Sequence, residues 1–358
     1  MDTRTSIDLV VVTGGTGHVG AMVIHQLLNV GYSVRATARP TKVDTLKDTH
    51  PNANGRLEVV EMNDLVADAG KWPEILQGVD AVIHVAAPVY HPGTTSEYIY
   101  ASANVGTQKL LDAVAQSSVK RFVLTSPLGV FFNPDFSSLF DHVVYDHNTW
   151  SPLEDFDPKE HDPSYAYIAS KITSEKLVWK AADKSPQIDF TTILPSTVYG
   201  WFLKNYPVPK SVSEFNANKF LYQLIEKGVR FPEYPLTDLV HNRDVAKAHV
   251  LALTAPVLPK GQRKRFIVSQ GNMTWVQAIA FLQEPETVEK FRAREHDILS
   301  RLPDVSMAGM QSQFKVDRTL TESVLGMKQE DYVPWQEILL EVVPAMMDWE
   351  QSHSDLVC

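Results

Sequence analysis

The sequence predicts an α/β protein built on a doubly wound parallel sheet, with a smaller, mostly helical C-terminal substrate lobe. Strand-like and helix-like segments alternate over the first two hundred residues with short connections, which is the pattern of a parallel sheet covered on both faces. Four of the 17 glycines fall within residues 14–20, between a strand-like run and a helix-like run. With 358 residues, 44% of them hydrophobic and 21% charged, the chain is long enough for a large core and too apolar for disorder.

The strands are predicted from short runs of β-branched and aromatic residues, and the helices from apolar residues at a spacing of three and four. Apolar residues recur at that helical spacing from Val19 to Val30, and Gly31 stands where a helix C-cap belongs. A second helical pattern covers 105–115, and Asp162-Pro163-Ser164 marks the start of a third helix. The expected strands cover 9–12, 32–38, 57–60, 81–87, 121–125, 190–194 and 265–268.

Residues 1–198 and 241–272, which hold these strands, are predicted to form the nucleotide-binding domain. Prolines and aromatic residues become frequent between 199 and 235, and the last eighty residues have mostly helical patterns. We therefore expect residues 199–240 and 273–358 to form a substrate lobe over the carboxyl edge of the sheet, where ligands of such folds bind.

The glycine-rich loop predicts a dinucleotide site of the Rossmann type. Gly14, Gly17 and Gly20 stand directly after the first strand and directly before the first helix. A tight turn, close approach of the backbone to a pyrophosphate and close helix–strand packing each exclude a Cβ atom. The free N–H groups and the positive dipole end of the helix would then face the phosphates. The alternative is a strand-to-helix turn without a ligand.

The end of the second strand favours NADP(H) over NAD(H). NAD-binding sites place an acidic residue there, about 20 residues after the glycines, to hold the ribose 2′-hydroxyl. This chain has Arg39 at that position and Lys42 soon after, with no acid before Asp44. A guanidinium can bind a 2′-phosphate through two parallel hydrogen bonds. A solvated surface arginine is the alternative.

Tyr167 and Lys171 are candidate catalytic residues. They stand four apart on the helix predicted from Asp162, so they lie on one face of it. A phenol has an ordinary pKa of about 10, and a neighbouring ammonium and a nicotinamide cation would lower that pKa. A tyrosine followed by a lysine four residues later is common by chance on amphipathic helices. Here the pair indicates a catalytic site because it lies beyond a nucleotide loop, in the helix after the fifth strand. Tyr165 has Ala169 four residues on and lacks a lysine partner.

Further motifs accompany the glycine loop and the Tyr167/Lys171 pair. They are Val34–Arg39, Asp64-Leu65, Val82–Pro88, Asn104–Thr107, Leu194–Gly200 and Arg243–Ala246. With them the chain resembles the extended short-chain dehydrogenases/reductases of the NAD-dependent epimerase/dehydratase superfamily. Within that family it is most similar to dihydroflavonol-reductase and methylglyoxal-reductase-like enzymes that reduce aldehydes and ketones. The resemblance covers about residues 8–270 and weakens beyond them.

The resemblance also implies roles for single residues. Asp64 would meet the adenine amine while Leu65 flanks the ring. Ala86 and Ala87 would line the cofactor channel, and Pro195 with Val198 would border the nicotinamide. The full set expected to bind NADP(H) is Gly14, Thr16, Gly17, His18, Val19, Arg39, Lys42, Asp64, Leu65, Ala86, Ala87, Lys171, Pro195 and Val198.

The chain departs from this family at the end of the fifth strand. The family reads Thr-Ser-Ser there, and its second serine donates a hydrogen bond to the substrate carbonyl, whereas this chain reads Thr125-Ser126-Pro127. Losing one such donor costs roughly 10²–10³ in rate. Because side chains alternate along a strand, Ser126 is expected on the face opposite residue 127. Three explanations stay open: Ser126 or Thr125 repositioned as the catalytic donor, a polar group from the aromatic loop 131–150, or a different reaction.

The leading hypothesis is NADPH-dependent reduction of an aldehyde or ketone, with hydride from the nicotinamide and a proton from Tyr167. A second hypothesis, motivated by Pro127, is a non-redox isomerase, dehydratase or cyclase on the same scaffold. A third, a redox-sensing regulator, is disfavoured by the presence of Tyr167 and Lys171. Aromatic residues suggest a hydrophobic or natural-product substrate, although an ordinary core explains several of them. They are Phe131, Phe132, Trp150, Tyr199, Trp201, Phe202 and Tyr206.

The composition narrows the expected partners to a small-molecule carbonyl substrate. The net charge of −10 argues against a surface for nucleic acid or anionic membranes. The sequence has no run of about 18 apolar residues and no signal-peptide layout, so a cytoplasmic protein is expected. The single cysteine, Cys358, excludes disulfides and cysteine-rich metal sites, and without a His-Glu-x-x-His pattern no metal is expected. A monomer and a homodimer are both compatible with the sequence.

Overall fold

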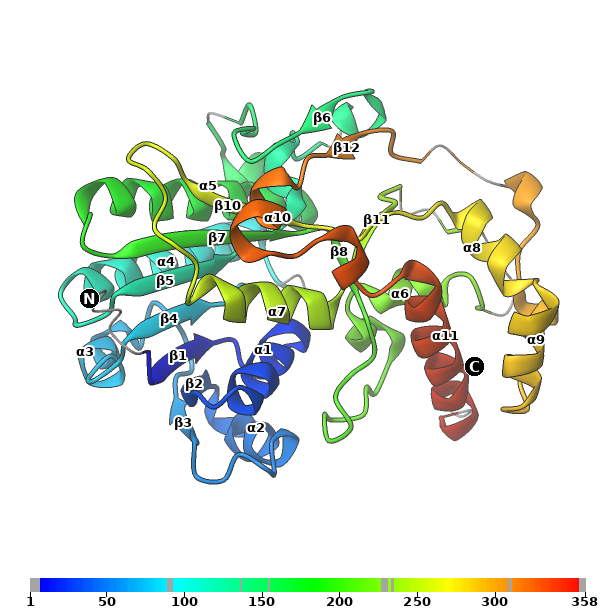
Figure 1. The fold of residues 1–358 in the computed structure, drawn as a ribbon, viewed down its shortest axis with the longest axis horizontal. Helices are drawn as coiled ribbons and strands as arrows, with labels where there is room; N and C mark the ends of the chain where they lie inside the picture. Colours follow the sequence, from blue (N-terminus) through cyan, green and yellow to red (C-terminus); the bar gives the residue numbers. More distant parts are fainter. Residues whose placement is uncertain are drawn as a thin grey trace.

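Seven parallel strands form the central sheet of the computed structural model, which describes residues 7–88, 93–135, 137–153, 155–226, 231–232, 235–307, 309 and 311–353. Their order is β10-β7-β5-β4-β1-β2-β3 (Figure 1). They are β1 (Leu9–Thr13), β2 (Ser33–Ala38), β3 (Leu57–Glu61), β4 (Ala81–His84), β5 (Arg121–Thr125), β7 (Asp189–Pro195) and β10 (Lys264–Val268). The order reverses between β1 and β4, so the topological switch point lies at the carboxyl end of β1, where the glycine loop begins. The predicted doubly wound parallel sheet is confirmed.

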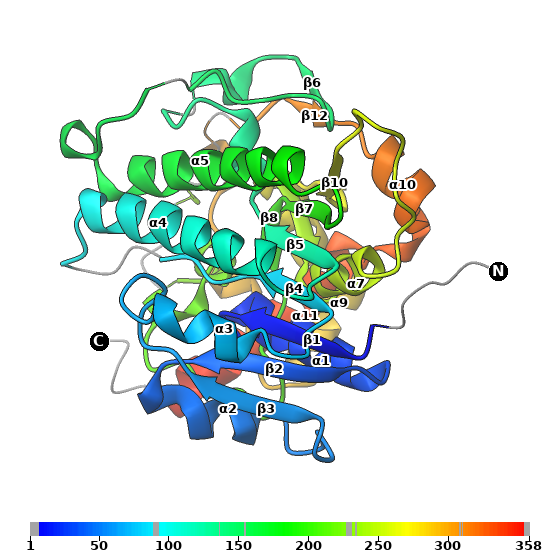
Figure 2. The same cartoon turned by 90° about the vertical axis from the view of Figure 1, so that its left-hand side faces the viewer.

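Helices cover both faces of this sheet (Figure 2). One layer holds α1 (His18–Asn29), α2 (Val43–Thr49), α7 (Asn242–Ala252) and α10 (Thr319–Leu325), and the other holds α3 (Trp72–Ile75), α4 (Ser96–Ala115) and α5 (Pro163–Lys184). Val10 and Val12 of β1 face the core shared with α1 and α7, and Val11 faces the core shared with α3, α4 and α5. Because both faces are covered, the strands are apolar in unbroken runs, as the sequence shows.

Most predicted elements agree with the structure, and β4 differs at its end. It ends at His84 rather than at residue 87, because the main-chain N–H of Ala86 donates to the side chain of Thr13, at 3.1 Å, instead of extending the ladder. The predicted helix stop at Gly31 is confirmed, since α1 ends at Asn29 and Gly31 has a φ of +102°.

Helix α4 begins well before the predicted residue 105. It starts at Ser96, where the Thr95 side chain accepts a hydrogen bond from the N–H of Tyr98 as an N-cap. These first turns have no apolar stripe because α4 contacts α5 partly through polar groups, and Ser174 Oγ donates to Oδ1 of Asn104 at 2.9 Å. A search for apolar periodicity therefore finds only the second half of the helix.

A second apolar core lies beyond the carboxyl ends of the strands (Figure 1). Its helices are α6 (Asn218–Tyr222), α8 (Trp275–Leu282), α9 (Pro285–Arg292) and α11 (Trp335–Ser352). A three-stranded sheet in the order β11-β9-β8 stands between this core and the main sheet, formed by β8 (Thr197–Tyr199), β9 (Asp238–His241) and β11 (Gly271–Asn272). The expected domain boundary after residue 198 falls within β8.

Part of the segment predicted for the substrate lobe lies against the main sheet. The short strand β12 (Lys315–Val316) pairs with β6 (Val144–Tyr145), and Leu325 of α10 belongs to the core beneath α1 and α7. The division into two lobes stays a prediction. Cys358 lies outside the described residues. Within the ranges given above, no helix is long and apolar enough to span a membrane.

Candidate active site

The glycine loop is packed so tightly that its glycines cannot carry side chains. The main-chain N–H of Gly17 donates to the oxygen of Gly14 at 3.0 Å, which closes the turn. Gly14 has a φ of +69°, and a Cβ atom there would lie 2.7 Å from the main-chain nitrogen of Ala86. A Cβ atom on Gly20 would lie 2.1 Å from the oxygen of Gly14. Both substitutions would require the backbone to move.

The start of α1 fits the pyrophosphate of a dinucleotide. Gly17 is its N-cap residue, and no side chain caps the helix there, so its first N–H groups are left for a ligand. Gly17 is exposed, and Thr16 and Val19 are half-buried beside it. The hydroxyl of Tyr206 donates to the main-chain oxygen of Thr16 at 2.8 Å, which ties a distant segment to the loop. The residues present therefore fit the phosphates of NADP(H).

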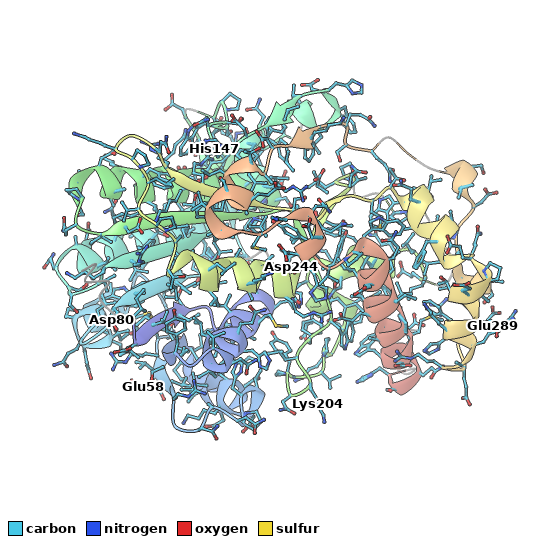
Figure 3. All side chains as sticks on the ribbon, in the orientation of Figure 1. Glu58, Asp80, His147, Lys204, Asp244 and Glu289 are labelled. Atoms are coloured by element: carbon cyan, nitrogen blue, oxygen red, sulfur yellow. The ribbon has the colours of Figure 1, made fainter. Side chains whose placement is uncertain are left out.

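The side chain of His18 is directed away from this loop, into the protein. Its Nε2 atom lies 2.9 Å from the main-chain oxygen of Gly200 and 2.7 Å from Nδ2 of Asn242. Asn242 is the first residue of α7, the helix that carries the Asp244 labelled in Figure 3. Burial lowers the pKa of His18 to about 4, so the ring is neutral at neutral pH. In this arrangement only the main-chain N–H of His18 is left to serve the predicted cofactor role.

A buried hydrogen-bonded chain under the loop was missed by the sequence reasoning. Oγ1 of Thr13 accepts from the N–H of Ala86, at 3.1 Å, and lies 2.7 Å from Nδ1 of His84. Nε2 of His84 lies 3.2 Å from Oγ1 of Thr107 on α4. Burial lowers the pKa of His84 to about 3, and a neutral ring suits this arrangement. Thr13 and His84 are paired at the ends of the neighbouring strands β1 and β4. This strand pairing is the feature from which their contact could have been predicted.

The predicted 2′-phosphate residues lie at the other end of the site. Arg39 directly follows β2, and Lys42 ends the turn before α2, where its N–H donates to the oxygen of Arg39 at 2.8 Å. Both residues are exposed. Neither side chain has a hydrogen-bond or ion-pair partner within the described ranges, so both cations are available to an incoming phosphate.

The predicted adenine residues lie beyond β3, in a turn that packs on α4. Oδ1 of Asp64 accepts from the N–H groups of Val66 and Ala67, at 2.7 and 2.8 Å. A Cβ atom on Gly106 of α4 would lie 2.8 Å from Cβ of Leu65, so this glycine lets the turn approach the helix. The contact of Asp64 with adenine stays a prediction, as does that of Leu65.

Tyr167 and Lys171 occupy the first half of α5, whose N-cap is Asp162, as the sequence predicts. Nζ of Lys171 donates to the main-chain oxygen of Thr125 at 3.1 Å and lies 6.0 Å from the ring centre of Tyr167. Burial lowers the pKa of Lys171 to about 8. Burial raises the pKa of Tyr167 in this structure. The expected lowering by the Lys171 ammonium together with a nicotinamide cation stays a prediction.

Two hydroxyls lie at the end of β5, and that of Ser126 has no hydrogen-bond partner within the described ranges. Oγ1 of Thr125 lies 2.7 Å from Nε2 of His249 on α7, so Thr125 is engaged on the far face of the sheet. Oγ of Ser126 is buried and has no hydrogen-bond partner within the described ranges. A Cβ atom on Gly129 would lie 3.0 Å from Ile168 and 3.8 Å from the Pro127 ring, so the proline lies close to the helical turn that carries Tyr167.

The remaining residues predicted to bind the cofactor lie at the carboxyl ends of β4 and β7, the two neighbours of β5, and in β8. Pro195 ends β7 and is buried, Val198 is half-buried in β8, and Ala86 and Ala87 follow β4 half-buried. Several of the aromatic residues expected around the cleft are instead core residues. Phe131, Phe132 and Tyr199 are at most 2% exposed.

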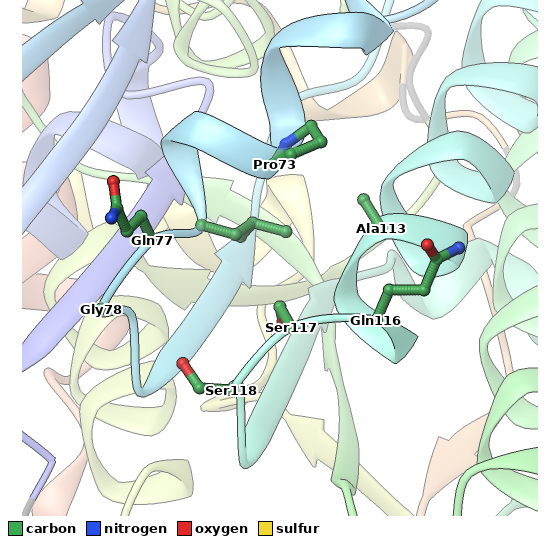
Figure 4. A pocket seen from close by; sticks show the side chains of 8 residues that line it. Pro73, Gln77, Gly78, Ala113, Gln116, Ser117 and Ser118 are labelled. Atoms are coloured by element: carbon green, nitrogen blue, oxygen red, sulfur yellow. The ribbon is translucent and has the colours of Figure 1, made fainter.

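A surface groove of about 480 Å³ lies between α3 and α4, at the amino ends of β4 and β5 (Figure 4). This is the sheet edge opposite to the glycine loop, so the groove is separate from the candidate active site. It is lined by Pro73, Leu76, Gln77, Gly78, Ala113, Gln116, Ser117 and Ser118. In the part of the chain that the structure describes, no group of three or more His, Cys, Asp or Glu side chains could hold a metal ion.

The fold and the glycine loop define a dinucleotide-binding α/β protein. The model of the NAD dependent epimerase/dehydratase family matches residues 10–266. The chain belongs to this family, the extended branch of the short-chain dehydrogenases/reductases, so the predicted family is confirmed.

Known proteins of similar length resemble the whole chain. Dihydroflavonol 4-reductase of Arabidopsis thaliana is 28% identical over 345 residues, covering 91% of this chain and 84% of that protein. Ketoreductase sphI of Aspergillus fumigatus is 27% identical over 355 residues, covering 95% and 98%. Among solved structures, yeast methylglyoxal/isovaleraldehyde reductase Gre2 complexed with NADPH has a TM-score of 0.77 at 22% identity, covering 96% of this chain and 99% of that one.

Proposed function

We propose that the protein reduces the carbonyl group of a small aldehyde or ketone with NADPH, using Tyr167 as the proton donor. The observation that carries this proposal is the hydrogen bond of 3.1 Å from Lys171 to the main-chain oxygen of Thr125. It holds the first half of α5 over the carboxyl end of β5, at the sheet edge where ligands of this fold bind. A tyrosine and a lysine one helical turn apart therefore stand beside the cofactor site.

The comparisons support the coarser class directly: the chain is an NADP-dependent oxidoreductase of the extended short-chain type. Its relatives include a dihydroflavonol 4-reductase and a ketoreductase, and the solved Gre2 holds NADPH. The exposed cations Arg39 and Lys42 at the end of β2 support the preference for NADPH, because a 2′-phosphate needs positive charge there. We also propose that the substrate is a hydrophobic or natural-product carbonyl compound.

The chemistry that we propose divides between cofactor and protein. When bound, the nicotinamide supplies the hydride that adds to the carbonyl carbon. Tyr167 gives its phenolic proton to the carbonyl oxygen, so that the C=O group becomes CH–OH. The buried surroundings that raise the pKa of Tyr167 keep the phenol protonated before each turnover. Lys171, whose pKa of about 8 leaves it mostly charged at pH 7, then stabilises the phenolate.

The test follows NADPH oxidation at 340 nm with a panel of aliphatic and aromatic aldehydes and ketones. The wild type is expected to oxidise NADPH with at least one of them, and Tyr167→Phe is expected to lose at least 10²-fold in kcat. Tyr165→Phe is the matched control, because Tyr165 lies on the same helix without a lysine one turn on. Tight NADPH binding without any carbonyl-dependent oxidation would overturn the proposal.

Pro127 supports a second candidate function, a non-redox isomerase, dehydratase or cyclase on the same scaffold. Its ring lies close to the turn of α5 that carries Tyr167, at the position where the family places a hydrogen-bond donor. In that case Tyr167 would act as an acid–base group. A substrate that turns over without change in absorbance at 340 nm, and only with intact Tyr167, would favour this second function.

A further inference from the structure

Two buried serine hydroxyls at the carboxyl edge of the sheet have no hydrogen-bond partner within the described ranges. Ser126 directly follows β5 and Ser196 directly follows β7, and the two residues are 1% and 6% exposed. Buried polar groups in native proteins are normally hydrogen-bonded, so an unpaired one requires an explanation such as a ligand that completes it.

Ser196 lies on the α5 side of the sheet. Its main-chain N–H donates to the oxygen of Val268 at 3.1 Å, which continues the pairing of β7 with β10 one residue past the end of β7. Because the pairing continues, side chains still alternate there, and Ser196 is on the same side as Leu194. Leu194 packs in one cluster with Ile168 and Ile172 of α5.

The apolar cluster around Leu194 also contacts Tyr167, so it relates the position of Ser196 to the candidate catalytic pair Tyr167 and Lys171. Tyr167 is half-buried against the cluster that contains Leu194, and Ser196 is the next residue on that side toward the carboxyl edge. Strands β5 and β7 are neighbours, with Thr125 level with Ile193. Thr125 is the residue whose main-chain oxygen accepts the hydrogen bond from Lys171. Ser196 therefore stands beside the strand end over which Tyr167 and Lys171 are held.

The register of β5 with β7 also shows that the two unpaired serines, Ser126 and Ser196, lie at different levels along the strands. With Thr125 level with Ile193, Ser126 is level with Leu194, inside the apolar layer under α5. Ser196 is two residues farther along its strand, about 7 Å nearer the carboxyl edge at 3.3 Å per residue. Counted on from this register, Pro127 would be level with Pro195. A proline supplies neither a hydroxyl nor an N–H group. Ser196 is thus an unpaired hydroxyl one residue beyond the level of Pro127, which stands where the family has its hydrogen-bond donor.

We propose that Ser196 donates the hydrogen bond to the substrate carbonyl oxygen that Pro127 cannot supply. The inference rests on the proposed carbonyl reduction. The Ser196 hydroxyl keeps its proton, polarises the C=O bond and holds the oxygen near the phenol of Tyr167, while the proton transferred comes from Tyr167. The residue is catalytic in the sense that it touches the reacting oxygen.

The test compares Ser196→Ala, Ser196→Thr and Ser126→Ala with the wild type, using a carbonyl compound that the wild type reduces. Ser196→Ala is expected to lose about 10²-fold in kcat/KM for the carbonyl, the loss typical of one such donor, with its NADPH dissociation constant changed less than threefold. Ser196→Thr keeps a hydroxyl and is expected to recover most of that loss. Ser185→Ala is the control for removing a buried serine hydroxyl, because Ser185 lies at the far end of α5.

The outcomes separate this proposal from the proposed function. A wild type that reduces no carbonyl contradicts the function itself. An active wild type with Ser196→Ala within threefold of it overturns the role of Ser196 alone, as does a loss that appears in Ser126→Ala instead. A loss of NADPH affinity equal to the loss of kcat/KM also overturns it, because the hydroxyl would then hold the cofactor. Melting temperatures check folding, and activity of Ser196→Thr keeps the test valid if Ser196→Ala is unstable.

Discussion

Nε2 of His18 lies 2.9 Å from the main-chain oxygen of Gly200, and these two residues are 182 positions apart in the sequence. His18 opens the helix that follows the glycine loop, and Gly200 follows β8, so the contact joins the cofactor site to the segment that leads into the second core. The same oxygen of Gly200 accepts from Nδ2 of Asn218 on α6, at 2.8 Å. The segment after β8 is therefore held at Gly200 from two helices, α1 and α6.

His18→Phe tests whether this side chain binds the cofactor. The phenyl ring can keep the contact with Phe202, whose ring centre lies 5.0 Å from that of His18, and Asn218 still satisfies the oxygen of Gly200. We expect a loss of about 1 kcal/mol in the free energy of unfolding, as for one hydrogen bond, and an NADPH dissociation constant within threefold of the wild type. Denaturant titration and fluorescence titration measure the two quantities. A tenfold weaker binding of NADPH would show that the imidazole itself contacts the cofactor.

Arg39→Ala tests the choice of cofactor. Because Arg39 is exposed and unpaired within the described ranges, its removal is expected to leave the fold intact and to remove one contact to the 2′-phosphate. NADPH binding should weaken by about 10- to 100-fold, the usual effect of a charge-assisted hydrogen bond, while NADH binding stays unchanged. Lys47→Ala, which removes another exposed cation from α2, is the matched control. An equal effect on both cofactors, or none, contradicts the assignment.

Four buried histidines predict sensitivity to acid. Burial lowers the pKa of His18, His50 and His249 from 6.5 to about 4, and that of His84 to about 3. The unfolded chain therefore takes up protons below pH 6.5 that the folded protein does not, so acid favours unfolding. We expect the full stability above pH 6.5 and a decrease between about pH 6 and 4, of up to about 1.4 kcal/mol per pH unit for each histidine.

Urea denaturation at pH 7.5, 6 and 5 measures this slope. Asp238 has the opposite effect, because burial raises its pKa from 3.8 to about 6 and the folded state then holds a proton that the unfolded chain has lost. Its contribution to stability is largest below pH 3.8 and is lost as the pH rises through 6. A stability that is constant from pH 7.5 to 5 would contradict the assignment of neutral, buried imidazoles.

Arg265 and Glu175 form an ion pair that is completely buried, with 2.8 Å between Nε and Oε1. Arg265 also donates to the main-chain oxygen of His147, which lies close to β10 and α5 (Figure 3), and its guanidinium lies 3.9 Å from the ring centre of Trp150. Arg265→Met leaves a buried carboxylate without its partner and is expected to cost about 3–5 kcal/mol in the free energy of unfolding.

The double variant Arg265→Met/Glu175→Gln provides the comparison. Because it removes both charges, it is expected to be more stable than Arg265→Met alone. Chemical denaturation of both variants measures the difference. If the two variants were equally unstable, the loss would come from the packing of Arg265 against Trp150 rather than from the unpaired carboxylate.

Local patterns were sufficient for the sheet and for the Tyr167/Lys171 pair. The strands are short apolar runs buried on both faces, and Tyr167 and Lys171 lie one turn apart on a helix whose start is marked by Asp162. The glycine loop could also be predicted, because each close contact there excludes a side chain. In these cases the signal lies within a few neighbouring residues.

Contacts between distant segments could not be predicted in this way. The chain of hydrogen bonds through His84 joins three elements, and nothing near His84 in the sequence points to Thr13 or Thr107. The expected lowering of the phenol pKa of Tyr167 by the Lys171 ammonium and a nicotinamide cation stays a prediction. Ser196 lies within the Leu194–Gly200 motif, but only the strand register relates it to Pro127.

The pairing of Glu175 with Arg265 also sets an order on biosynthesis. Their separation in the chain is 90 residues, and ribosomes add about 5–20 residues per second. For about 5–18 s after Glu175 is added, therefore, a nascent chain contains this carboxylate without the guanidinium that neutralises it. During that interval α5 cannot settle against the sheet with Glu175 charged and dry. Packing of α5 with a charged Glu175 is therefore completed only after the edge strand β10 has been synthesised.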